Sequence, residues 1–148
     1  MTIDSFSGQY AFLSNFYVAP FQAIDSMALE GRTWRTTEHF FQAMKNMVPA
    51  NREAIRLADT ARAAKNLGIS RTFTKLRSNW LEIRVDVMRY ALRRKFACNP
   101  KLAKKLLATG DRELIEGNIW GDRFWGVCDG EGKNMLGKLL MELRTELR

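Results

Sequence analysis

The sequence predicts an α+β fold, mostly α-helical, in a single domain with a small β element near the N-terminus. Strand-like segments precede residue 36, whereas helix caps and helical apolar spacing dominate after it. No internal repeat and no Gly/Ser-rich or Pro-rich linker interrupts the 148 residues, a length typical of one domain. Such a chain buries about two-thirds of its unfolded surface, so a core forms without disulfides.

The first third is predicted to be extended. Residues 9–18 are rich in aromatic side chains, and segments 27–29 and 32–34 flank Glu30-Gly31, which is typical of a hairpin turn. Pro20 disfavours a central strand nearby, because proline donates no ladder hydrogen bond.

The first helix is predicted to begin at Thr36 or Thr37 and to end near Met47, ahead of Pro49. Threonine is a good N-cap, and the carboxylate of Glu38 suits the positive end of the helix dipole.

Two short helices follow in the prediction. Asn51 caps the first, over residues 51–59, and Thr60 caps the second, over 60–66, with Gly68 as its stop.

The longest helix is predicted to begin at Ser78 or Asn79 and to end near Ala97. Its apolar face has helical spacing, and the residues on that face are Trp80, Leu81, Ile83, Val85, Val87, Met88, Ala91, Leu92 and Phe96.

The last third is predicted to hold a helix over 99–110, an extended piece over 113–116, a loop over 117–132 and a helix that begins near Asn134. The final helix is expected to bury five leucines, which are Leu136, Leu139, Leu140, Leu143 and Leu147.

The chain is basic, with 24 Lys and Arg against 16 Asp and Glu and a net charge of +8. Such a surface attracts polyanions or phosphorylated small molecules, and the attraction weakens with salt. The alternative is that the charge only aids solubility, and composition leaves both open.

Other classes of protein are disfavoured. No apolar run approaches the ~20 residues that cross a bilayer, and the first residues do not read as a signal peptide. Cys98 and Cys128 are too few and too far apart for a disulfide scaffold or a CxxC site, and a single histidine disfavours a His-rich metal site. We expect a cytoplasmic protein with no metal, no cofactor and no membrane partner.

The first candidate site lies on the helix that follows Thr37. Glu38, Gln42 and Lys45 are spaced i, i+4 and i+7, so they share one face, with Phe41 beside them. A polar stripe on a helix more often faces water, and spacing alone favours that interpretation. His39 is interpreted as a structural, partly buried histidine.

The second candidate is the loop over 118–126. Trp120 and other aromatics offer flat faces for a planar ring, while Asp122 beside them suits proton transfer. An aromatic mini-core that tethers the loop is an equal alternative.

Two further segments are weaker candidates. Gly132, Lys133 and Asn134 precede the last helix, where backbone N–H groups and a lysine could hold phosphate; a ligand-free helix start is the alternative. Asn15 lies among aromatics at 12–17 and fits either a ligand contact or a turn.

Five segments together resemble one known family. They read F-L-S-N-F at 12–16, W-R-T-T-E-H-F-F-Q-A-M-K at 34–45, N-W at 79–80, W-G-D at 120–122 and G-K-N-M-L-G at 132–137. In this order and over nearly the whole chain they resemble the NADAR family, also called the YbiA-like family.

This resemblance implies a mostly helical, YbiA-like N-glycosidase domain that cuts bonds between ribose C1 and nitrogen. By similarity its functional positions are Glu38, Lys45, Trp80, Trp120 and Asp122, with Asn15 lining the site. Glu38 is expected on the sugar side and Asp122 as the acid, while Lys45 either binds phosphate, orients Glu38 or forms a Schiff base.

The remaining roles are predictions made on top of the resemblance. Trp80 or Trp120 is expected to stack on the base, Phe41 and Gln42 to line the site, and Gly132, Lys133 and Asn134 to take the phosphate. The expected partner is a phosphorylated ribosylamino-pyrimidine of the riboflavin type or, alternatively, an ADP-ribosylated guanine, with nucleic-acid contact through the basic surface. An alternative of another class is a non-catalytic module that binds ADP-ribose or nucleic acid.

Overall fold

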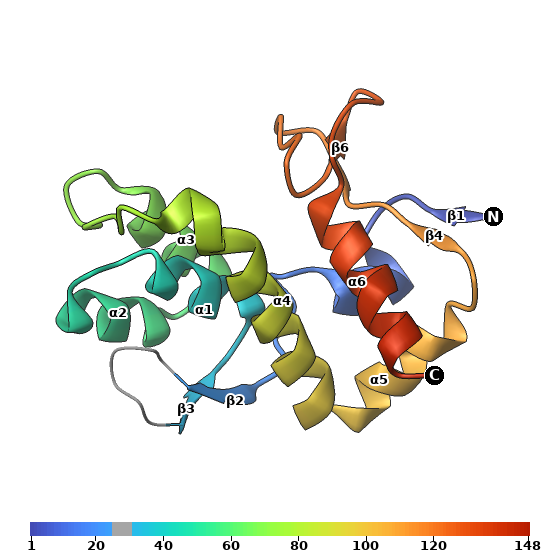
Figure 1. The fold of residues 1–148 in the computed structure, drawn as a ribbon, viewed down its shortest axis with the longest axis horizontal. Coiled ribbons are helices and arrows are strands. Elements are labelled where there is room, and N and C mark those ends of the chain that lie inside the picture. The colour runs from blue at the N-terminus through green and yellow to red at the C-terminus, as the bar shows by residue number, and fades with distance from the viewer. Residues whose placement is uncertain (25–30) are drawn as a thin grey trace. The chain divides into compact units, whose positions relative to one another are not determined.

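A computed structural model describes residues 1–24 and 31–148. It confirms the α+β class, because long helices are accompanied by short strand pairs (Figure 1). The described residues form two compact units. One unit joins Met1–Ser14 to Pro100–Arg148, and the other is Asn15–Asn99.

The unit Asn15–Asn99 opens with an antiparallel pair. Strand β2 (Phe21–Ile24) pairs with β3 (Gly31–Trp34) in the register Phe21↔Trp34. A strand at 32–34 was predicted correctly, but its partner is β2. The predicted strand at 27–29 and most of the predicted turn lie outside the described residues.

Helix α1 (Thr37–Met44) begins at the predicted cap, because the Thr36 hydroxyl accepts a hydrogen bond from the His39 N–H at 3.1 Å. The helix ends before the predicted Met47. Asn46 forms an isolated β-bridge with Leu76 instead, which takes the chain out of the helix.

Helices α2 (Pro49–Arg56) and α3 (Ala61–Ile69) correct two boundaries. α2 begins at Pro49 rather than Asn51, since proline is pre-organised for the first turn. α3 begins at the predicted cap Thr60 but runs through Gly68, which was expected to stop it.

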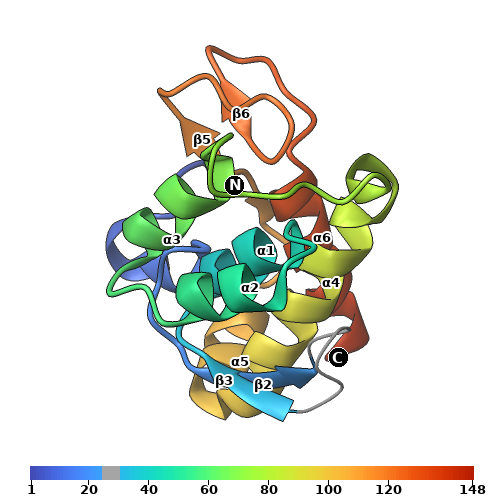
Figure 2. The ribbon, with the colours of Figure 1, turned by 90° about the vertical axis from the view of Figure 1, so that its left-hand side faces the viewer.

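Helix α4 (Trp80–Cys98) follows the predicted cap Asn79 and buries Trp80, Met88, Ala91, Leu92 and Phe96. Leu81, predicted on the apolar face, is 74% exposed. Figure 2 shows α1 among α2, α3 and α4, and all three helices contact it.

The core of this unit centres on the Phe40 ring of α1. The Trp34 ring packs edge-on against it with centroids 5.0 Å apart, and the Phe21 and Tyr90 rings lie at 6.2 and 5.8 Å. This packing accounts for the burial of α1 on its apolar side.

The other unit contains a parallel pair, β1 (Thr2–Ile3) with β4 (Glu113–Leu114), side by side in Figure 1. Residues 8–13, predicted to be extended, form the 3-10 helix η1 (Gly8–Leu13). The sequence neighbours Phe12 and Leu13 are both buried, whereas a strand would point them to opposite faces.

Helices α5 (Pro100–Ala108) and α6 (Met135–Glu146) complete this unit, and α6 contacts β4. A second parallel pair, β5 (Gly117–Asn118) with β6 (Val127–Cys128), lies within the predicted loop. Four of the five predicted core leucines are buried; Leu147 is 38% exposed, because α6 has ended before it.

Three properties concern binding classes. Within residues 1–24 and 31–148, no helix is both long and apolar enough to cross a membrane. The same residues contain no group of three or more His, Cys, Asp or Glu that could hold a metal ion. Cys98 and Cys128 are free thiols.

Candidate active site

The N-terminus of α1 rests on Asn15. The Glu38 N–H donates to the Asn15 backbone carbonyl at 3.2 Å, and the Thr37 hydroxyl donates to the Asn15 side-chain carbonyl at 2.7 Å. Asn15 therefore satisfies polar groups that a helix start leaves open. Within residues 1–24 and 31–148 the amide nitrogen of Asn15 has no acceptor, and it is the group that we expect to donate to a ligand.

Glu38 and Gln42 form a buried polar pair. They are 7% and 3% exposed, and the Gln42 amide nitrogen donates to Glu38 Oε2 at 2.7 Å. The solvated-face interpretation of this stripe is therefore wrong. Burying a carboxylate is costly unless its oxygens are hydrogen-bonded, and the Gln42 amide supplies such a bond to Glu38.

A glycine on α3 shapes the position of Gln42. A β-carbon at Gly68 would collide with the Gln42 side-chain oxygen and carbons, so only glycine allows this approach. Gln42 Oε1 is buried, and no described residue hydrogen-bonds to it. Gly68 thus forms a notch that holds Gln42 in line with Glu38.

Lys45 lies one turn further along the same face. Its Nζ is 5.6 Å from the centroid of the Phe41 ring. Burial lowers the pKa of Lys45, the carboxylate of Glu38 opposes that shift, and the charge of Lys65 adds to it. A lowered pKa enlarges the neutral amine fraction, which is the form that acts as a nucleophile.

Phe41 and Trp80 form an aromatic wall beside Lys45. Their ring centroids are 5.0 Å apart at 60°, and the residues are 6% exposed each. With so little free surface, Trp80 supports the wall better than it offers a face for stacking. Trp120, in the other unit, is 63% exposed and has such a face.

His39 is occupied by structural contacts. Its Nε2 lies 3.0 Å from the Ala58 carbonyl oxygen, which only accepts, so Nε2 carries the proton and Nδ1 accepts from the Thr36 hydroxyl at 2.7 Å. Burial lowers the pKa of His39, against the effect of the Ala58 hydrogen bond. A neutral imidazole braces the N-terminus of α1.

Two cations lie on α3, the helix that contacts α1, and sequence reasoning missed both of them. Arg62 Cζ and Lys65 Nζ lie 5.1 and 5.9 Å from the centroid of the Phe16 ring. The sequence signal for them is two cations spaced i, i+3 at the start of a helix that has no acidic residue in its first turn.

The loop over 118–126 lies in the unit Met1–Ser14 with Pro100–Arg148. Asp122 Oδ1 accepts from the backbone N–H groups of Phe124 and Trp125 at 3.1 and 2.9 Å, and the Asp122 N–H donates to Asn118 Oδ1. Asp122 therefore organises the turn with one carboxylate oxygen. The acid role of Asp122 stays a prediction.

The start of α6 is occupied by its own loop. The N–H groups of Lys133, Asn134, Met135 and Leu136 donate to carbonyl oxygens of residues 123–126. These backbone donors are engaged, so the predicted phosphate cradle would have to rely on the Lys133 side chain.

Gly132 and Asn134 serve the packing of the same turn. A β-carbon at Gly132 would collide with the Gly126 carbonyl. The Asn134 side chain accepts from the Glu116 N–H and donates to the Leu114 carbonyl, each at 2.9 Å. Their place in the motif is explained by packing, and phosphate contact by these two residues stays a prediction.

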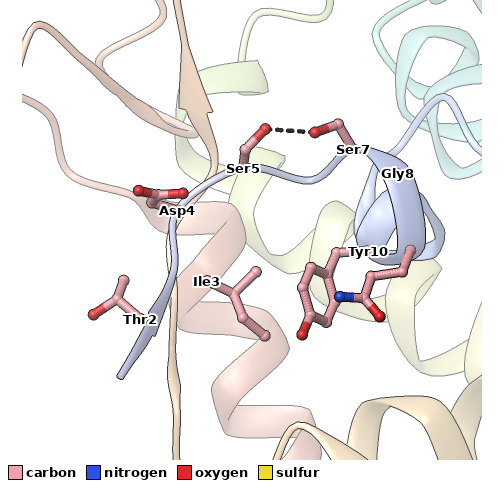
Figure 3. Close-up of a pocket in the computed structure, with 8 residues that line it drawn as sticks. Thr2, Ile3, Asp4, Ser5, Ser7, Gly8 and Tyr10 are labelled. Atoms are coloured by element: carbon pink, nitrogen blue, oxygen red, sulfur yellow. Dashed lines mark hydrogen bonds between the residues drawn. The ribbon is translucent and has the colours of Figure 1, made fainter.

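A hollow of about 370 Å³ opens along the N-terminal segment (Figure 3). The residues that line it are Thr2, Ile3, Asp4, Ser5, Ser7, Gly8, Gln9 and Tyr10. Ser5 and Ser7 hydrogen-bond each other at 2.8 Å across its rim. None of the predicted site residues is in this lining, and it offers no buried ionisable group.

Comparisons with known proteins identify the family of this chain. Residues 4–148 match the NADAR domain. The chain is 41% identical over 144 residues to the N-glycosidase YbiA of Escherichia coli, which covers 97% of this chain and 85% of that protein. It is also 41% identical over 142 residues to a riboflavin biosynthesis protein of Vibrio vulnificus, covering 94% of this chain and 36% of that protein.

The fold matches as well. The NMR structure of E. coli YbiA has a TM-score of 0.84 and 40% identity, over 99% of this chain and 83% of that chain. A shared fold and relatives named for the activity define this protein as an N-glycosyl hydrolase. It belongs to the NADAR family.

Proposed function

We propose that this N-glycosidase hydrolyses the ribosyl C1–N bond of a phosphorylated ribosylamino-pyrimidine. The observation that carries the proposal is the buried Glu38–Gln42 pair on the same helix face as Lys45. A riboflavin biosynthesis protein among the relatives supports a pyrimidine base of that type.

Glu38 suits the sugar side of the bond. Cleavage of a ribosyl C–N bond builds positive charge on C1 and the ring oxygen, and a nearby carboxylate stabilises that charge or aims a water at C1. The hydrogen bond from Gln42 holds Oε2 in one orientation, so this stabilisation is pre-organised.

Lys45 has two roles open to it. It either binds an anionic part of the substrate and orients Glu38, or its neutral amine attacks C1. In the covalent route the Lys45 amine bonds to C1, and the bonds from C1 to the ring oxygen and to the base nitrogen break, which leaves an imine between Lys45 and C1. One proton of the Lys45 amine goes to the ring oxygen and the other to the leaving nitrogen, so the base departs as a neutral amine. Water then adds to the imine and releases the sugar aldehyde and the free amine.

Replacing Glu38 by Gln tests the assignment. Glu38→Gln keeps a hydrogen-bond acceptor for Gln42 but removes the charge, so we expect the melting temperature to hold and kcat to fall at least ~100-fold. Released pyrimidine is followed by chromatography, with the exposed Glu82→Gln as the matched control. Equal turnover by the wild type and Glu38→Gln would refute the role of Glu38.

Borohydride reduction separates the two roles of Lys45. Reduction during turnover converts an imine into a stable secondary amine, which mass spectrometry locates on a Lys45 peptide, and Lys45→Met serves as the control. If no adduct forms on Lys45 during turnover, the covalent route is wrong and the anion-binding role remains.

A second candidate substrate is an ADP-ribosylated guanine. It is favoured by the concentration of positive charge in residues 15–99, where fifteen Lys and Arg face seven Asp and Glu. Offering both substrate types to the purified protein decides between them. Relatives named N-glycosidases favour an enzyme over a non-catalytic binding module.

A further inference from the structure

All of the net charge of this protein resides in one unit. Residues 15–99 carry fifteen Lys and Arg against seven Asp and Glu, a net +8, whereas residues 1–14 and 100–148 carry nine of each. The basic character therefore belongs to the unit that holds Glu38 and Lys45, and it favours an anionic partner there.

Many cations of this unit already have oxygen partners. Arg32 and Arg56 pair with Glu53 at 3.1 and 2.5 Å. Arg94 donates to the Gln22 carbonyl at 2.7 Å, and Arg35 donates to the Ala58 carbonyl at 2.9 Å. These contacts explain such residues without a ligand.

Arg62 and Lys65 differ from that pattern. Within residues 1–24 and 31–148, no side chain or carbonyl accepts a hydrogen bond from either of them and no carboxylate pairs with them. Both instead lie over the Phe16 ring, at 5.1 and 5.9 Å from its centroid. The ring gathers two positive charges and leaves their N–H donors available.

Their place on α3 is unfavourable without an anion. Arg62 and Lys65 lie in the first turns of the helix, one turn apart on one face, and no acidic residue occupies the first turn. Positive side chains there oppose the helix dipole and repel each other. A bound anion would be stabilised by both charges and by the dipole.

The pair borders the candidate active site. Phe16 follows Asn15, whose carbonyl holds the Glu38 N–H at 3.2 Å. Lys65 is close enough to Lys45 to lower the pKa of Lys45. Helix α3, which carries both cations, contacts α1. An anion bound to Arg62 and Lys65 would therefore lie on the helix that packs against the one carrying Glu38 and Lys45.

We propose that Arg62 and Lys65 bind the phosphate group carried by the ribose of the substrate. The inference rests on the proposed function and names the residues that recognise the phosphorylated part. A guanidinium contributes paired N–H donors and an ammonium a point charge, and both are used for phosphate recognition. Phe16 aligns the two side chains.

Ribose 5-phosphate is the direct probe, because it is the sugar product expected from a 5′-phosphorylated ribosylamine. Isothermal titration compares ribose 5-phosphate, ribose and inorganic phosphate on the wild type and on Arg62→Gln/Lys65→Gln. We expect the wild type to bind ribose 5-phosphate more tightly than ribose, and the double variant to bind ribose 5-phosphate at least ~10-fold more weakly. Added salt should weaken only the phosphate-dependent part.

Lys101→Gln/Lys104→Gln is the matched control, since it removes two exposed positive charges from α5. It should bind ribose 5-phosphate as the wild type does. ADP-ribose is titrated in parallel. If the Arg62→Gln/Lys65→Gln variant loses as much affinity for ADP-ribose as for ribose 5-phosphate, the same site also binds a diphosphate. Unchanged binding of ribose 5-phosphate by that variant, or no preference of the wild type for the phosphorylated sugar, overturns the proposal.

Failure of the proposed function is distinguishable from failure of this site. Glu38→Gln should bind ribose 5-phosphate normally while losing turnover. If no ribosylamine or ADP-ribosylated substrate is cleaved but binding still depends on Arg62 and Lys65, the proposed substrates are wrong and the phosphate site stands. If substrate is cleaved but the double variant keeps the wild-type KM, the phosphate site is wrong.

Discussion

At the scale of single residues, two neighbours on α1 have opposite duties. Both ring nitrogens of His39 lie within hydrogen-bonding distance of protein groups, so the imidazole is engaged in holding the start of the helix. Glu38 is almost as buried, yet its carboxylate faces Gln42 and acts electrostatically on Lys45. We therefore propose Glu38, and not His39, as the side chain that meets the substrate, despite the usual preference for histidine in proton transfer.

Asp122 allows a sharp test at the same scale. Asp122→Asn keeps Oδ1 as acceptor for the Phe124 and Trp125 N–H groups, whereas Asp122→Ala loses both bonds. If Asp122 supplies the proton, Asp122→Asn should lose about 100-fold in kcat at an unchanged melting temperature. Asp122→Ala should lose stability as well, by roughly 1–3 kcal/mol.

Thermal unfolding and steady-state turnover of both variants are the measurements. Full activity of Asp122→Asn together with reduced activity of Asp122→Ala would contradict the acid role and make Asp122 a positioning residue of the loop.

At the scale of elements, the contact between α1 and α3 determines the geometry of the carboxylate. Gly68 lets α3 approach Gln42 so closely that no side chain fits between them. The Gln42 side chain is thereby held in one conformation, in which its amide nitrogen donates a hydrogen bond to Glu38. Helices α1 and α3 together therefore determine the position of Glu38 Oε2.

Gly68→Ala should displace Gln42 and lower kcat at least ~10-fold, although alanine itself favours the helix by about 1 kcal/mol. Gly31→Ala is the control, because a β-carbon there meets no atom of residues 1–24 and 31–148 within 4 Å. The decisive measurement is a double-mutant cycle with Gln42→Ala. If the effect acts through Gln42, Gly68→Ala should change little in the Gln42→Ala background; an undiminished effect there would mean a general packing defect.

At the scale of the whole molecule, one buried charge opposes folding. Lys95 of α4 is 0% exposed, with its Nζ 5.4 and 5.9 Å from the centroids of the Phe96 and Tyr17 rings. Burial lowers the pKa of Lys95 to about 7 from 10.5. Between these values the unfolded chain binds more protons than the folded one, so this residue makes stability rise with pH.

We therefore predict that the wild type gains roughly 2 kcal/mol of unfolding free energy relative to Lys95→Met from pH 7 to pH 9. Below pH 7 Lys95 is charged in the folded protein and lowers its unfolding free energy by the largest amount. Lys95→Met should be the more stable protein there. Urea unfolding at several pH values measures the difference. Parallel pH profiles of the two proteins would show that Lys95 does not titrate in this range.

Local sequence determined much of the secondary structure. Thr36 and Thr60 cap α1 and α3 as predicted. Each threonine hydroxyl accepts a hydrogen bond from the N–H group three residues later, so the cap depends only on residues that are close in sequence. The helical periodicity of about 3.6 residues likewise predicts that Glu38, Gln42 and Lys45 share one face. The family motifs then assigned an N-glycosidase activity to that face.

Tertiary structure alone decided whether the helix face with Glu38, Gln42 and Lys45 points to the solvent or to the protein interior. Whether Glu38 is solvated or buried depends on α3 and on residue 15, which lie far from it in sequence. The notch at Gly68 and the cations over Phe16 arise from the same long-range packing, and so does the closure of the α6 N-terminus by residues 123–126. Hydrogen bonding between near neighbours is readable from a sequence, but the burial of a side chain is a property of everything packed around it.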